Sequence, residues 1–114
     1  MREGFLVMIE QIIKRDGRTA PFELDKIANA IFGAAQSVGG QDYEMAHELA
    51  EQVEKELEKT VKEKIPTVEQ IQDTVETVLI DSGHARTAKK YILYRNERTR
   101  VREMNTRLMK VYED

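Results

Sequence analysis

The 114-residue chain contains no cysteine, no tryptophan and only two prolines. Without cysteine it can form no disulfide or thiolate metal cluster, and it offers no thiol nucleophile. Its longest uninterrupted apolar run is residues 5–9, far short of the roughly 18 residues that a membrane-spanning helix requires. No small-residue cleavage site follows this run, so we expect no signal peptide and a cytoplasmic protein.

Sequence signatures of catalysis and phosphate binding are also missing. The chain has no GxxxxGK[ST] loop and no GxGxxG turn, so a bound nucleotide would depend on cationic side chains and backbone amides. His47 and His84 have no second histidine or thiol at ligand spacing, which disfavours a metal site. Near the basic residues at 14–26 we recognise no candidate base, nucleophile or Walker-type metal carboxylate, and we therefore expect no catalysis.

The composition is that of one globular domain. Hydrophobic residues make up 40% and charged residues 34% of the chain, and the apolar positions are periodic. The formal net charge is −3, so the chain as a whole does not favour nucleic acid.

A basic hairpin is the most informative local signal. Asp16-Gly17 predicts a two-residue type I′ turn between strands at about 11–15 and 18–22. Apolar residues at 5–13 also match a helical stripe, and residues 1–8 could extend the strand or lie loose. The cations that crowd this region are Lys14, Arg15, Arg18 and, at the start of the next helix, Lys26. Such a cluster suits a polyanion such as a triphosphate, although it could also be a solvated basic turn.

Four helices are predicted after the hairpin. The first covers 24–38, the second begins after a cap at Asp42, and Ile65-Pro66 ends the region of the second. Thr67 and Gln70 form the T-x-x-Q capping box of the third, which Ser82-Gly83 ends.

The last predicted helix begins at His84. Its expected buried side comprises Ala88, Tyr91, Ile92, Val101, Met104, Leu108 and Val111. Residues 95–107 contain five arginines and two glutamates, which indicates either a docking surface or an exposed charged helix.

Three segments together resemble the ATP-cone, the regulatory nucleotide-binding domain found at the N-terminus of many ribonucleotide reductases. They are KRDGR with the following PF and LDKI (residues 14–27), PTVEQIQDTVE (66–76) and AKKYILYR (88–95). The closing YILYR and the trailing arginines look most like the anaerobic branch of these enzymes.

The resemblance implies an α+β fold: a small antiparallel β-sheet with the DG hairpin, capping a four-helix bundle, with the triphosphate under the sheet. Lys14, Arg15 and Lys26 would meet phosphates, with Arg18 as a further candidate. Thr67, Gln70 and Ile71 would lie near the base and sugar, and Phe22 and Ile27 would supply apolar walls. Tyr91, Tyr94 and Arg95 would come from the last helix. Phe22 and both tyrosines could instead serve the core.

The implied function is reversible allosteric binding of ATP or dATP with Mg²⁺, without catalysis. The implied partners are a reductase catalytic domain or a second copy of the chain. Ala20 and Gln72 depart from residues of some family members, which affects the choice between ATP and dATP. We expect an N-terminal extension at 1–9, the ATP-cone at 10–102 and a helix end or linker at 103–114. The alternative is a helical module that binds protein or nucleic acid through its basic last helix.

Overall fold

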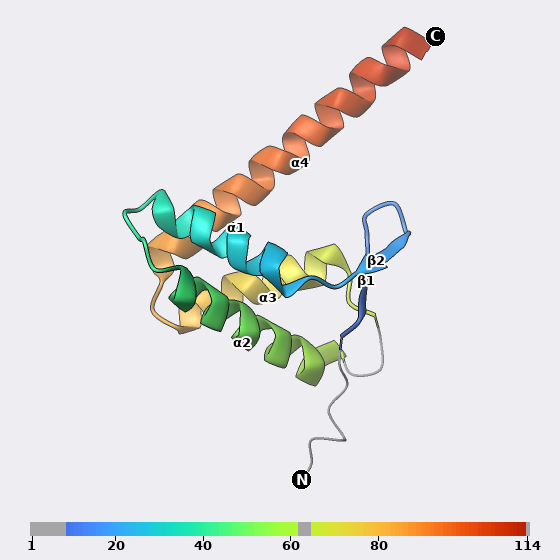
Figure 1. Cartoon of the computed structure of the whole chain (residues 1–114). Coiled ribbons are helices and arrows are strands. Elements are labelled where there is room, and N and C mark those ends of the chain that lie inside the picture. The colour runs from blue at the N-terminus through green and yellow to red at the C-terminus, as the bar shows by residue number, and fades with distance from the viewer. Residues whose placement is uncertain (1–8, 62–64, 114) are drawn as a thin grey trace.

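A two-stranded sheet and four helices make up the computed structural model of the chain (Figure 1). It describes residues 9–61 and 65–113, and the side chains of these residues except at 102 and 105–113. The elements are β1 (Gln11–Ile13), β2 (Thr19–Pro21), α1 (Leu24–Gln36), α2 (Tyr43–Val61), α3 (Val68–Asp81) and α4 (Ala85–Glu113). The predicted α+β class is confirmed, while residues 1–8 of the expected N-terminal extension lie outside the described residues.

β1 and β2 form an antiparallel hairpin in which Ile12 lies opposite Ala20. Both strands are shorter than predicted, and the two-residue type I′ turn is wrong. The Gly17 N–H donates to the Lys14 carbonyl (2.9 Å), and the Lys14 N–H donates to the Arg18 carbonyl (2.7 Å). These bonds enclose a three-residue loop whose last residue, Gly17, has φ of 90°. Such a loop is the G1-bulge connection, in which glycine is favoured because it tolerates positive φ.

The helices form a bundle in which α1 packs against α2 and α4, and α3 packs against the same two helices (Figure 1). The core is aliphatic, and Ile31, Leu57 and Leu79 are at most 1% exposed. Full burial of such a side chain contributes about 1.5–3 kcal/mol, so these contacts dominate the stability of the bundle. α1 ends at Gln36, two residues before the predicted end.

Caps fix where the second and third helices begin. The Met45 N–H donates to the Asp42 carboxylate (3.0 Å), which confirms the predicted cap ahead of α2. At α3 the predicted capping box is present: the Gln70 N–H donates to Thr67 Oγ1, and the Thr67 N–H donates to Gln70 Oε1. Each such cap stabilises a helix by about 1 kcal/mol.

The hairpin is attached to the bundle at the start of α3. The Ile13 N–H donates to the Pro66 carbonyl (2.9 Å), and Ile13 forms an isolated parallel bridge with Thr67. The hairpin therefore has a fixed position at one end of the bundle, next to the first residues of α1 and α3 (Figure 1).

α4 extends well beyond the other helices (Figure 1). Its 29 residues span about 44 Å, whereas the 14 residues of α3 span about 21 Å. The prediction that Val101 and Met104 are buried is wrong: they are 44% and 52% exposed, because the shorter neighbouring helices do not reach them. The predicted buried residues Leu108 and Val111 lie outside the described side chains. Among the described helices, none has the length and apolar character needed to cross a bilayer.

Candidate functional site

A cavity of about 490 Å³ lies between the hairpin loop, α1, α3 and α4. The residues that line it are Arg15, Lys26, Asn29, Ala30, Val68, Gln72, Tyr91, Tyr94, Arg95, Arg98 and Thr99. Four of them are cations and none is a carboxylate, although acidic residues outnumber basic ones in the chain. The cavity is therefore a basic site in an acidic protein, which favours an anionic ligand.

The structure brings together five of the predicted site residues around this cavity: Arg15, Lys26, Tyr91, Tyr94 and Arg95. They are separated by up to 80 positions in the sequence, and they line one cavity from the hairpin loop, α1 and α4. Lys26 carries an ion pair with Glu23 one turn earlier (3.0 Å) and remains largely exposed. A salt bridge of this kind is weak, so Lys26 can exchange it for a stronger anion.

The other predicted residues lie elsewhere. Lys14 is exposed on the hairpin, and Phe22 and Ile27 are partly buried against the core. Ile71 is a core residue, while Thr67 and Gln70 use their polar groups in the capping box. None of these six is among the residues that line the cavity.

Arg18 is held by its own loop and is not a lining residue. Its Nε lies 2.7 Å from Asp16 Oδ2, and its backbone N–H donates to Asp16 Oδ1 (3.0 Å). The backbone hydrogen bond is the main reason that the pKa of Asp16 lies below its usual value, with smaller contributions from the side chain of Arg18 and the charge of Lys14. Asp16 thus neutralises one of the four cations that the sequence suggests for phosphate binding.

Six lining residues were not among the predicted site residues, although the sequence singled out Gln72 as a departure from some family members: Asn29, Ala30, Val68, Gln72, Arg98 and Thr99. Helical spacing could have found most of them, because residues three or four apart share a helix face. Asn29 and Ala30 follow Lys26 at this spacing, and Arg98 follows Tyr94 and Arg95. Arg98 donates to Tyr94 Oη (3.0 Å) and lies 5.7 Å from the centre of that ring, so the two side chains are ordered together.

Arg95 is fixed by two carboxylates of α3. Its Nη1 lies 2.5 Å from Glu76 Oε2 and 2.9 Å from Asp73 Oδ1. Burial by itself lowers the pKa of Arg95, but the hydrogen bonds to Asp73 and Glu76 outweigh it and the pKa is raised. Arg95 is consequently a permanent charge that ties α4 to α3 in the wall of the cavity.

Tyr91 forms the buried part of the same wall. The residue is 6% exposed, and burial raises the pKa of its phenol to about 12. The charge of Arg95 opposes this shift, while Glu76 and Asp73 add to it. Tyr91 therefore stays neutral at physiological pH and presents a ring with a phenolic hydroxyl.

Gln72 contributes an unsatisfied acceptor. Its Oε1 is buried and has no hydrogen-bond partner within the described residues. An unpaired buried acceptor typically lowers the stability of the fold by about 1–3 kcal/mol, so it usually has a structural or functional explanation. Since Gln72 lines the cavity, a ligand with a hydrogen-bond donor would satisfy it.

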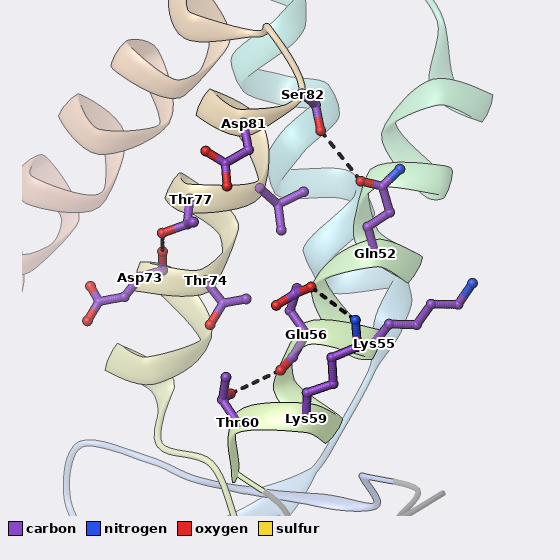
Figure 2. Close-up of a pocket in the computed structure, with 11 residues that line it drawn as sticks. Gln52, Lys55, Glu56, Lys59, Thr60, Asp73, Thr74, Thr77, Asp81 and Ser82 are labelled. Carbon is purple, nitrogen blue, oxygen red and sulfur yellow. Dashed lines mark hydrogen bonds and ion pairs between the residues drawn. The ribbon is translucent and has the colours of Figure 1, made fainter.

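A second hollow lies between α2 and α3 and has a different character (Figure 2). It measures about 430 Å³ and carries three carboxylates, Glu56, Asp73 and Asp81, besides Lys55 and Lys59. The hydroxyls of Thr60 and Thr77 in this groove donate to backbone carbonyls one turn earlier (Figure 2). Its mixed charge gives no comparable preference for an anion.

Comparison with known proteins matches the ATP cone domain family to residues 10–100. The chain is 45% identical over 112 residues to a vitamin B12-dependent ribonucleoside-diphosphate reductase of Thermoplasma acidophilum, an alignment that covers 94% of this chain and 14% of that protein. It is 37% identical over 102 residues to an anaerobic ribonucleoside-triphosphate reductase of Haemophilus influenzae, covering 90% of this chain and 14% of the relative.

A third relative is the alpha subunit of a ribonucleoside-diphosphate reductase of Treponema pallidum, which is 38% identical over 96 residues. That alignment covers 80% of this chain and 11% of the relative. The chain thus spans at most 14% of the length of these three proteins. Since the family match extends over most of the sequence, the chain belongs to the ATP cone domain family.

Proposed function

We propose that this domain binds an adenine nucleotide, ATP or dATP, reversibly in the cavity and acts as an allosteric regulatory domain without turnover. The observation that carries the proposal is the lining of the cavity, with four cations and no carboxylate. A volume of about 490 Å³ lies within the range of roughly 300–1,000 Å³ typical of small-molecule sites.

The phosphates would bind where cations converge from three elements. Arg15 comes from the hairpin loop, Lys26 from the first turn of α1 and Arg98 from α4. Guanidinium groups hold phosphate oxygens in a bidentate manner, and each charge-assisted bond contributes about 1.5–3 kcal/mol. Lys14 would act by longer-range attraction, whereas Arg18 would first have to exchange its ion pair with Asp16 for phosphate.

The base would lie towards Gln72. A glutamine amide can pair with adenine in a bidentate manner, accepting from the exocyclic amino group while donating to a ring nitrogen. Guanine presents an oxygen at the equivalent position, which would leave Gln72 Oε1 unsatisfied. Thr67, Gln70 and Ile71 would act indirectly, because they fix the start of the helix that carries Gln72.

Mg²⁺ would arrive with the nucleotide. Among the described residues, no three histidine, cysteine, aspartate or glutamate side chains gather at a distance suitable for a metal ion. Mg²⁺ commonly keeps several waters and binds mainly through substrate phosphates, which needs no protein cage. The lining residues also include no carboxylate or histidine to serve as a general base, which supports binding without hydrolysis.

The target of regulation would be the catalytic part of a ribonucleotide reductase, or a second copy of this chain. The relatives are reductases, and this chain matches only a small fraction of each. We place the nucleotide-binding unit at residues 10–102 and regard 103–114 as a connection.

Isothermal titration calorimetry with ATP, dATP and GTP tests the proposal. We expect micromolar affinity for the adenine nucleotides, or about −8 kcal/mol, and much weaker binding of GTP. The proposal would be refuted if millimolar ATP and dATP gave no heat in calorimetry and no thermal shift. Sustained phosphate release by the purified protein would refute the regulatory reading.

A second candidate function is docking of an acidic partner on α4. Val101 and Met104 are exposed there beside Arg100, which gives a surface that is both apolar and basic. Arg100→Ala should then abolish partner binding while leaving the nucleotide affinity unchanged, whereas Lys26→Ala should do the reverse.

A further inference from the structure

The Arg15 side chain joins three elements of the fold. Its Nη2 donates a hydrogen bond to Thr99 Oγ1 of α4 (3.1 Å), a residue 84 positions away. Its Nε lies 3.5 Å from Glu69 Oε2, in the first turn of α3. Because Arg15 belongs to the loop between β1 and β2, these contacts hold the tip of the hairpin against two helices.

Arg15 and Thr99 line the cavity, and Glu69 does not. A phosphate in the cavity would seek the same N–H groups, since a guanidinium offers its donors in one fixed plane and phosphate takes two at a time. The ion pair with Glu69 is longer than a charge-assisted hydrogen bond of about 2.7–2.9 Å. The present contacts of Arg15 are therefore weak enough to be exchanged for phosphate.

We infer that Glu69 is a positioning residue that competes with the phosphates of the effector for Arg15, and that this exchange releases the hairpin from α4. The inference rests on the proposed function, because it requires a polyphosphate in the cavity. Without ligand, Arg15 forms its ion pair with Glu69 and its hydrogen bond with Thr99. With ligand, Arg15 binds phosphate and Thr99 loses its hydrogen-bond donor. Binding in the cavity thereby removes the contact between the hairpin and α4, and the exposed part of α4 responds.

The first test measures ATP affinity by calorimetry in Glu69→Gln. We expect binding about two- to fivefold tighter than in the wild type, the size expected for loss of a partly exposed ion pair that opposes binding. Asp81→Asn is the matched control, because it removes the same charge from the same helix in the groove between α2 and α3. Its affinity should be unchanged, and circular dichroism confirms that both variants are folded.

The second test measures movement. Since the chain has no cysteine, Thr19→Cys on β2 and Val101→Cys on α4 allow a single pair of spin labels at two exposed positions. The distance distribution should shift or broaden when ATP is added. Arg15→Ala should give the changed distribution without any ligand, since it removes the same contacts.

Two results would overturn the inference and leave the proposed function intact: ATP binding by Glu69→Gln no tighter than by Asp81→Asn, or a label distance that is identical with and without ATP although calorimetry shows binding. Failure of the wild type to bind ATP at all would overturn both. The two proposals therefore fail in distinguishable ways.

Discussion

Replacing Gln72 by leucine should change stability and binding in opposite directions. Gln72 Oε1 is buried with no partner in the part of the chain that the structure describes, and an unsatisfied acceptor costs about 1–3 kcal/mol. Leucine has a similar volume and no polar atom, so Gln72→Leu should stabilise the ligand-free protein by about 1 kcal/mol. With an unfolding entropy of about 2.1 cal/mol/K per residue over 114 residues, this is a rise in Tm of about 4 °C.

The same substitution should weaken ATP binding. A neutral hydrogen bond contributes about 0.5–1.5 kcal/mol, which corresponds to a loss of about 2- to 13-fold in affinity. Differential scanning calorimetry and isothermal titration calorimetry measure the two effects. The matched control is Gln52→Leu in the groove between α2 and α3, which should leave the affinity unchanged and the stability within about 0.5 kcal/mol.

The reasoning about Gln72 would be refuted if stability and affinity both fell, because the amide would then support the fold. A rise in stability with unchanged affinity would show that the ligand does not use this oxygen. An acceptor that serves ligand binding predicts both changes together, a gain in stability of the free protein and a loss of ATP affinity.

Three further predictions concern other side chains. Lys26→Ala should weaken ATP binding by about 10- to 100-fold with unchanged helicity, as one charge-assisted phosphate contact allows; Lys59→Ala, which removes a similar ion pair at spacing i,i+3, should leave the affinity unchanged. Tyrosine absorbance should show a component that titrates near pH 12 and that Tyr91→Phe removes. Because the pKa of Tyr91 is raised in the folded protein, the stabilising contribution of Tyr91 is present below pH 10 and is lost as the pH rises through about 12. A tyrosine titration that is complete near pH 10 would contradict this. Burial first, and then the charges of Glu58 and Glu51, raise the pKa of Glu54. Glu54→Gln should therefore raise the Tm by about 1–3 °C at pH 7 and not below pH 4, and an equal gain at both pH values would exclude relief of charge as the cause.

Local patterns in the sequence were sufficient to predict most of the fold. The capping box at Thr67 and the cap at Asp42 are side-chain signals within one turn of the helix that they start, so they can be read without tertiary information. The hairpin was also predictable, but its loop length was not. A glycine at position 17 is compatible with a two-residue loop and with a three-residue loop. Which loop forms depends on the pairing of the two strands, and residues 16–17 do not determine that pairing.

The candidate site was only partly predictable for a related reason. Side chains such as Arg15 and Tyr91 line one cavity only because the hairpin is attached at the start of α3 and α4 packs against α3, which is a property of the assembled bundle. The sequence also gave no sign that Arg18 is held by Asp16, or that Val101 lies beyond the ends of its neighbours. An apolar position at helical spacing is buried only when another element is long enough to cover it.

The length of α4 has a mechanical consequence. Beyond Thr99 the helix continues to Glu113, a further 14 residues or about 21 Å. A helix is stiff over this distance, so under the proposed exchange it would act as a lever whose pivot lies beside Arg15. A tilt of about 10° at the pivot displaces the far end by about 4 Å, from the length just given. If the exchange at Arg15 tilts α4 in this way, an adjustment of a single side chain at the cavity would displace the far end of the helix by about the length of a contact between two proteins.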